Sequence, residues 1–165
     1  MSIDRYADHV FVIPEDDANR QIANGFCLDL SVRDRAIKIL SPPGGWSAVV
    51  KDFLRNHVKD MRSFPKRRMV LLIDFDDAMD RADKIMEEIP EDLRPRVYIL
   101  GVGSEPEKLK KAFAFRTSFE DIGRSLAQEC FENSRVLWSI ELLKHNAANL
   151  ERLEQDVKPF LIEPR

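Results

Sequence analysis

Hydrophobic positions along this chain follow two alternating spacings, which predict strands that take turns with helices. Short apolar runs rich in β-branched residues occupy residues 9–13, 36–40, 68–74 and 96–100, and turn-forming or acidic residues follow each run. Runs of this kind are typical of strands. The run at residues 68–74 does not alternate with polar residues, as expected for a strand covered on both faces.

Between these runs, apolar residues recur at every third or fourth position, which is typical of amphipathic helices. This spacing predicts helices over residues 17–28, 46–61, 77–88, 105–114, 119–131 and 134–157. Strands that alternate with helices indicate an α/β domain with a mainly parallel sheet. We therefore predict a Rossmann-like sheet of about four strands, flanked by helices and followed by a helical C-terminal extension.

The length of 165 residues corresponds to about one domain. Within it we expect an α/β core over residues 1–115, with C-terminal helices over residues 116–165 packed on the core or at an oligomer interface. No apolar run approaches the roughly 20 residues that cross a bilayer, and the N-terminus lacks the pattern of a secretory signal. With only two cysteines, a disulfide framework is not indicated, so we expect a cytoplasmic protein without a membrane partner.

Acidic residues follow three of the four predicted strands. They are Glu15 after the first strand, Asp74 and Asp76 at the end of the third, and Glu105 and Glu107 after the fourth. The carboxyl ends of parallel strands meet at one edge of a sheet, where ligands bind. We therefore expect Glu15, Asp74 and Asp76 to lie close together.

Carboxylates that lie this close repel one another unless a cation neutralises them. Hard divalent cations with oxygen ligands are the usual partners, which favours Mg²⁺ or Mn²⁺ here. In an extended segment, residues i and i+2 point to the same side, so Asp74 and Asp76 could share one ion. Acidic residues also stabilise helix N-termini, and capping of the following helices is the alternative interpretation.

The order and spacing of these motifs resemble those of the TOPRIM domain, shared by topoisomerases, bacterial primases and the overcoming-lysogenization-defect (OLD) nucleases. The matching segments are Val-Phe-Val-Ile-Pro-Glu at residues 10–15 and Val-Leu-Leu-Ile-Asp-Phe-Asp at residues 70–76. Residues 97–107 are similar to the OLD-type continuation, in which a strand and a short loop lead to an acidic residue. Two positions depart from the family pattern: Asp16 replaces the usual glycine, and Asn19 replaces a frequent acidic residue.

The resemblance implies Mg²⁺-dependent phosphoryl transfer on a nucleic acid, most simply by a small nuclease. By match, Glu15 would serve as general acid or base, while Asp74 and Asp76 would hold the metal. The resemblance further implies Glu105 or Glu107 as an accessory metal ligand.

The same Asp-x-Asp segment is also similar to the first motif of haloacid-dehalogenase-type phosphatases, in which the first Asp is the nucleophile and the second the acid or base. Asp74 and Asp76 would take these roles, and Ser104, Lys108 and the Glu120-Asp121 pair are the available downstream partners. A receiver-like domain that accepts phosphate on Asp74 is a third alternative.

Basic residues are grouped although the net charge is −3. That net charge argues against a protein that holds nucleic acid through its overall charge. However, the expected helix over residues 46–61 and its end carry four cations at helical spacing, namely Lys51, Arg55, Lys59 and Arg62. Such a face could follow a phosphate backbone, and a solvated helix surface is the alternative.

A non-enzymatic interpretation also remains open at this stage. In it the acidic edge is vestigial, and the chain is an interaction module. The expected long helix at residues 134–157 could then pair with its counterpart in a homodimer through its regularly spaced apolar residues.

Overall fold

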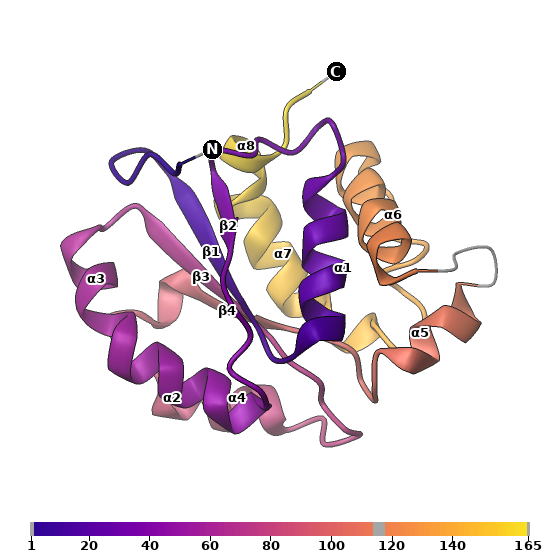
Figure 1. Cartoon of the computed structure of the whole chain (residues 1–165), viewed down its shortest axis with the longest axis horizontal. Helices are drawn as coiled ribbons and strands as arrows, with labels where there is room; N and C mark the ends of the chain where they lie inside the picture. The colour runs from indigo at the N-terminus through magenta and orange to yellow at the C-terminus, as the bar shows by residue number, and fades with distance from the viewer. Residues whose placement is uncertain (1, 114–117, 165) are drawn as a thin grey trace.

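A four-stranded, fully parallel sheet forms the centre of the protein, as predicted (Figure 1). The computed structural model describes residues 2–113 and 118–164. The strands are β1 (His9–Pro14), β2 (Ile37–Ile39), β3 (Arg67–Leu72) and β4 (Val97–Leu100). Their order across the sheet is β2-β1-β3-β4. Strands β1 and β3, which carry the two acidic motifs at their ends, are therefore neighbours.

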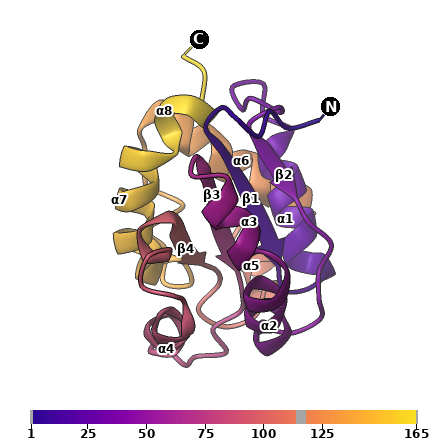
Figure 2. The same cartoon turned by 90° about the vertical axis from the view of Figure 1, so that its left-hand side faces the viewer.

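Helices cover both faces of the sheet (Figures 1 and 2). One layer contains α2 (Trp46–Asn56), α3 (Val58–Ser63) and α4 (Arg81–Glu88). The other layer contains α1 (Asp17–Cys27), α6 (Phe119–Glu132), α7 (Ala147–Asp156) and α8 (Lys158–Leu161). A short helix, α5 (Glu107–Ala112), and two 3₁₀ turns, η1 (Arg94–Arg96) and η2 (Lys144–Asn146), complete the described elements. None of the described helices is long and apolar enough to cross a membrane.

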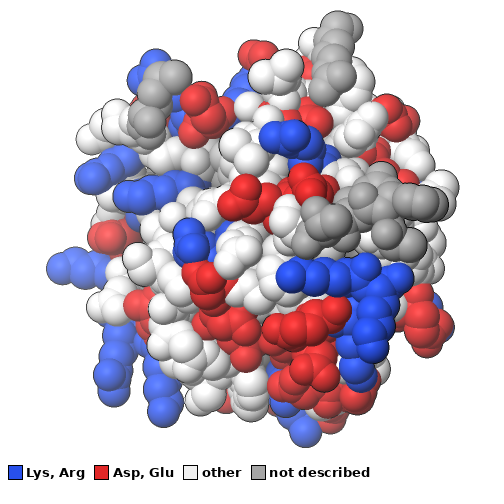
Figure 3. All heavy atoms as spheres, turned by 45° about the vertical axis from the view of Figure 1, so that its right-hand side comes forward, with Lys and Arg blue, Asp and Glu red and all other residues white. Residues whose placement is uncertain are grey.

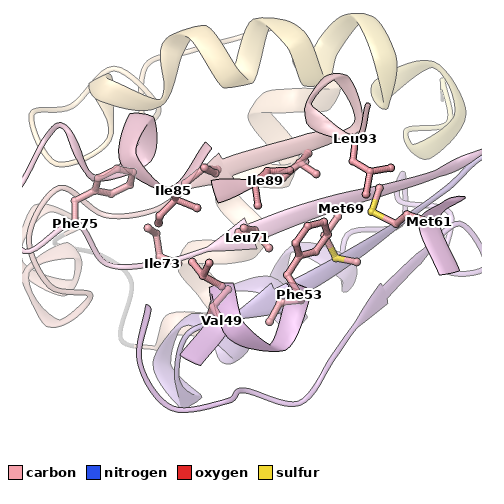
Figure 4. Close-up of a cluster of buried hydrophobic side chains, with 14 residues drawn as sticks. Val49, Phe53, Met61, Met69, Leu71, Ile73, Phe75, Ile85, Ile89 and Leu93 are labelled. Atoms are coloured by element: carbon pink, nitrogen blue, oxygen red, sulfur yellow. The ribbon is translucent and has the colours of Figure 1, made fainter. Parts of the chain in front are cut away.

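The side chains of β3 alternate between two hydrophobic cores. Met69 and Leu71 pack with Phe53 of α2 and Ile85 of α4 (Figure 4), whereas Val70 faces α1, α7 and α8 on the other side. Because both faces are buried, successive positions from Met69 to Leu72 can all be apolar, which explains the uninterrupted apolar run in the second part of the strand.

Two predicted helices differ from those observed on the α2/α4 face. The helix expected over residues 46–61 is divided at His57 into α2 and α3. The helix expected from residue 77 begins only at Arg81, because Asp76 and Asp77 adopt left-handed conformations with φ of 47° and 64°. Helix α5 also starts two residues later than residue 105, and the predicted end of this helix at Ala114 lies outside the described residues.

The long helix expected over residues 134–157 is wrong. Turns follow the end of α6, and regular helix resumes only at α7. The Glu129 carboxylate accepts the N–H groups of Leu137 and Trp138 at 2.8 and 3.1 Å, and the Asn146 side chain bonds to both backbone groups of Gly101. These tertiary hydrogen bonds outweigh the periodic pattern. A homodimer stays a prediction, but it no longer has a continuous helix as its basis.

The C-terminal helices are tied to the N-terminal core through a close contact between α1 and α6. A Cβ atom added at Gly123 would lie 1.9 Å from the Ile22 carbonyl oxygen, and one added at Gly25 would lie 2.0 Å from the Glu120 carbonyl oxygen. The two backbones therefore touch where each helix carries a glycine. The predicted division between residues 115 and 116 lies outside the described residues, but this contact joins the helices on its two sides into one packed layer.

Replacement of Gly123 by alanine should therefore destabilise the protein, although alanine ordinarily stabilises a helix by about 0.5–1 kcal/mol relative to glycine. We expect a loss of about 2 kcal/mol in the free energy of unfolding, because overpacking forces the backbones apart. Urea denaturation measures it. Gly103→Ala is the control, since its added Cβ would meet only ordinary contacts at 3.4–3.5 Å. Equal stability of G123A and wild type would contradict the close packing of α1 on α6.

Candidate acidic site at the carboxyl edge of the sheet

Glu15 and Asp74 lie together where β1 and β3 end. The backbone N–H of Glu15 donates to the Leu72 carbonyl at 2.8 Å, which continues the parallel ladder beyond β1. In a regular ladder the next bond would run from the Asp74 N–H to the Glu15 carbonyl. Here the Asp74 N–H donates instead to Oε2 of the Glu15 side chain, at 2.5 Å. A carboxylate thus takes the place of a backbone carbonyl in the sheet.

The Glu15 carbonyl is used by the loop after β2. It accepts the N–H groups of Gly44 and Gly45 at 3.0 and 3.1 Å. Both glycines have positive φ, 89° and 119°, a conformation that side chains disfavour. The Gly44–Gly45 turn therefore holds the end of β1 and places the start of α2 beside the acidic edge.

Asn19, in the first turn of α1, orients the Asp74 carboxylate. Its Nδ2 donates to Asp74 Oδ1 at 2.9 Å and to Asp16 Oδ1 at 3.0 Å. Asp16 is also the N-cap of α1, since its side chain accepts the Asn19 N–H at 2.9 Å. Asn19 is fully buried, and its Oδ1 accepts no hydrogen bond from the described residues. The two departures from the TOPRIM pattern are thus in contact with each other, and one of them contacts Asp74.

Asp76 is held differently from Asp74. Its left-handed backbone removes it from the extended arrangement that the sequence argument assumed. The guanidinium of Arg81 donates through Nη1 to Asp76 Oδ2 at 2.9 Å and to the Asp74 carbonyl at 2.7 Å. The same guanidinium lies over the Trp46 ring, 4.6 Å from its centroid. Arg81 therefore fixes the Asp-x-Asp loop against the start of α2.

Burial controls the electrostatics of this site. Burial raises the pKa of Asp74 to about 7; the Asn19 hydrogen bond opposes this rise, and the neighbouring carboxylates add to it. Burial also raises the pKa of Glu15, opposed by the hydrogen bond from the Asp74 N–H. Two carboxyl groups that are 8% and 7% exposed thus retain protons more readily than ordinary acids. Such perturbed groups are common at functional sites.

The donor atoms match a hard cation in part. Glu15 and Asp74 supply two carboxylates close enough for the charge of Glu15 to affect Asp74, and Mg²⁺ is often held by one or two carboxylates together with waters and substrate phosphates. Within residues 2–113 and 118–164, however, no three carboxylate, thiol or imidazole side chains lie close enough together to hold a metal ion. The structure therefore brings together the Glu15–Asp74 part of the predicted ligand set, while Asp76 pairs with Arg81.

Glu105 and Glu107 are exposed residues beyond β4. The loop that carries them reaches the Asp-x-Asp segment through its backbone, because the Asp77 N–H donates to the Gly103 carbonyl at 2.7 Å. Among the described residues, neither glutamate forms a hydrogen bond or an ion pair with Glu15 or Asp74. The structure thus places them near the edge of the sheet without bringing them into the acidic pair.

The predicted basic face is divided between two helices. Lys51 and Arg55 lie on α2, and Lys59 and Arg62 lie on α3; all four are exposed. Arg62 is neutralised, since it forms two hydrogen bonds with the Asp92 carboxylate at 3.0 and 3.1 Å. In the view of Figure 3, acidic and basic side chains lie side by side over the surface.

The sequence pattern indicated no role in the site for Asn19 or for Arg81. Asn19 had a weak signal, because it stands three residues after an N-cap aspartate, where a side chain can turn back towards the strand end. Arg81 had none, since its contact with Asp76 depends on a backbone turn that the periodicity assigned to a helix.

Comparison of the chain with protein-family models, with curated proteins and with solved structures found no match in any of the three. The TOPRIM resemblance therefore rests on the order and spacing of the motifs in the sequence.

Replacement of Asp74 by asparagine should stabilise the metal-free protein at high pH. The pKa of Asp74 is about 7 in the folded protein and close to 4 in an unfolded chain. The native state thus binds the proton more tightly, and ionisation of this residue lowers the free energy of unfolding as pH rises from about 4 to above 7. In EDTA we expect D74N to be more stable than wild type by about 2 kcal/mol or more near pH 8, with little difference near pH 4.

Thermal and urea unfolding at both pH values measure this difference. Asp80→Asn is the matched control, because Asp80 is an exposed carboxylate paired with Lys84 and should show no stabilisation at pH 8. A D74N protein less stable than wild type at pH 8 would contradict a strained, buried carboxylate at this position.

Proposed function

We propose that the protein catalyses Mg²⁺-dependent phosphoryl transfer on a nucleic acid, most simply as a small nuclease of TOPRIM type. The observation that carries the proposal is the buried Glu15–Asp74 pair at the adjacent ends of β1 and β3. In a TOPRIM-type site the glutamate and the first aspartate come from these two places. Burial gives them the proton affinities that such chemistry uses.

Glu15 is the proposed general acid or base. Its Oε2 accepts the Asp74 N–H, so Oε1 is the oxygen available to carry a proton to or from a reacting phosphate ester. The raised pKa of Glu15 favours proton retention, and a general acid works best when its pKa lies near the working pH.

Asp74 is the proposed metal ligand. Its Oδ1 accepts from Asn19, which leaves Oδ2 for a cation. A bound Mg²⁺ would supply stabilisation of the charge on the attacking and leaving oxygens. Arg81 uses only Nη1 in its hydrogen bonds to the described residues, so its other N–H groups remain for a substrate phosphate.

A phosphatase of haloacid-dehalogenase type is the second candidate, and one observation favours it. Lys108 Nζ donates to the buried Ser104 hydroxyl at 3.0 Å, and the Ser104 carbonyl accepts the Asp76 N–H at 3.4 Å. A serine and a lysine thus stand next to the Asp-x-Asp loop. In that family such residues bind the phosphate that the first aspartate attacks.

A nuclease assay with matched variants separates these functions. Purified wild type, E15Q, D74N and D80N are incubated with single-stranded DNA, duplex DNA and RNA in Mg²⁺, Mn²⁺ or EDTA. We expect metal-dependent cleavage by wild type and D80N, and a loss of about 100-fold or more in E15Q and D74N. The same proteins are assayed with p-nitrophenyl phosphate.

Hydrolysis of the phosphate monoester without cleavage of any nucleic acid would replace the nuclease by the phosphatase. Absence of both activities, with nucleic-acid binding retained, would leave a binding module. Full activity of E15Q would show that Glu15 is not the acid or base.

If the substrate is a nucleic acid that follows α2 and α3, three of the four predicted cations should contribute to binding. Lys51→Ala, Arg55→Ala and Lys59→Ala should each weaken DNA affinity and reduce the slope of log K against log salt by about 1. Arg62→Ala should change the slope less, because Asp92 already neutralises Arg62. Fluorescence anisotropy over a salt series measures these slopes, and equal slopes for all variants would exclude this face from the interface.

A further inference from the structure

The layer of helices that contains the C-terminal elements does not fill the space above the sheet. A cavity of about 150 Å³ lies between β1, β3 and β4 on one side and α1, α6, α7 and α8 on the other. Its walls are almost entirely apolar and include Val12 of β1, Ala23 of α1, Leu126 of α6 and Leu150 of α7, together with the Trp138 ring. The cavity is distinct from the acidic site, and the proposed function makes no use of it.

Protein interiors are packed about as densely as organic crystals, and voids larger than a water molecule are few. An apolar cavity of about 150 Å³ is large enough to hold a benzene-sized molecule and stays dry when nothing binds. The core on the other face of the sheet is filled by large side chains such as Phe53, Met61 and Leu71 (Figure 4). The two faces of the sheet therefore differ: one core is filled by the protein's own side chains, and the other contains a cavity that could hold a small molecule.

The polar residues of the cavity mark its mouth. They are Ser134, Arg135, Glu154 and Lys158, which are half-buried or exposed. Arg135 forms an ion pair with Glu154 at 2.9 Å. Lys158 donates to the neutral side-chain oxygen of Asn133 and, among the described residues, pairs with no carboxylate. The side chains that line the mouth thus include one cation more than anions. The nearby Glu129 carboxylate accepts hydrogen bonds from Ser134, Leu137 and Trp138, and the Glu151 carboxylate acts on Arg135, so Lys158 is the lining cation that the described carboxylates leave without an ion pair.

We propose that this cavity binds a small amphiphilic carboxylate, with an apolar body of about six to eight carbon atoms. The apolar body fills the space beside Trp138, where it replaces missing contacts of Ala23 and Leu150. The carboxylate lies at the mouth and pairs with the Lys158 ammonium, which gains a charged partner in place of a neutral amide oxygen.

Trp138 provides a direct measurement, because the chain contains only two tryptophans. Trp46 packs on the opposite face of the sheet, so the W46F protein reports from the cavity wall alone. We expect 8-bromooctanoate, whose bromine quenches indole emission, to quench Trp138 saturably. Octanoate without bromine should reverse the quenching by competition and raise the melting temperature of the wild-type protein.

Two variants in the W46F background test the two halves of the proposal. Ala23→Leu adds side-chain volume inside the cavity and should weaken bromooctanoate binding by at least about tenfold without loss of thermal stability. Lys158→Met keeps the apolar stem but removes the charge, and should weaken octanoate by about tenfold while leaving 1-octanol unchanged. Lys59→Met, on the other face of the molecule, is the matched control and should bind as the parent does.

Three results would overturn the proposal. Quenching that rises linearly with bromooctanoate and is the same in A23L would be collisional, which means that the cavity holds no ligand. If 1-octanol displaced bromooctanoate as well as octanoate does, the ligand would not need a carboxylate. Equal losses in K158M and K59M would show a general effect of charge. If A23L fails to fold, K158M and the octanol comparison still decide the matter.

Discussion

The hydrogen bond between the Asp74 N–H and the Glu15 carboxylate is the constraint on which the carboxyl edge of this sheet depends. Strands β1 and β3 pair over their full length, and a backbone carbonyl would ordinarily close the next rung. Because the Glu15 side chain does so instead, the Glu15 carbonyl is free to bind Gly44 and Gly45. The replacement of one backbone acceptor by a side-chain carboxylate therefore positions the acidic pair, the loop after β2 and the start of α2.

This arrangement has a cost that the surrounding residues reduce but do not remove. Asn19 donates to both Asp16 and Asp74, and Arg81 binds the Asp74 carbonyl beside Asp76. Even so, the pKa values of Glu15 and Asp74 remain above their ordinary range. A backbone rung would close the sheet without burying two acids, so the pair costs stability that the ladder alone does not require. This cost is the physical argument behind the chemical role proposed for the pair.

The sequence predicted the strands well and the turns poorly. The apolar run from Met69 to Leu72 in β3 is recognisable from the sequence, because a strand segment buried on both faces carries apolar residues at successive positions. The sequence motifs also predicted that Glu15 and Asp74 lie side by side, because neighbouring parallel strands end at the same edge of the sheet. The left-handed turn at Asp76 and Asp77 was not predictable from periodicity, and neither was the lack of regular α-helix between Ser134 and Asn146. The turn at Asp77 depends on the distant Gly103 carbonyl, and the conformation of the segment before α7 depends on the bonds of Asn146 to the distant Gly101, contacts that no local pattern contains.

The apolar cavity was likewise not predictable from the sequence. Periodicity shows which side of a helix is apolar, but it does not show whether two apolar sides meet. Here α6 touches α1 at Gly123, and Asn146 is tied to Gly101. The C-terminal segment is thus fixed at two points, to α1 through Gly123 and to the end of β4 through Asn146. These backbone contacts help to position the helices, so the space beneath them does not depend only on the volume of the side chains that point into it.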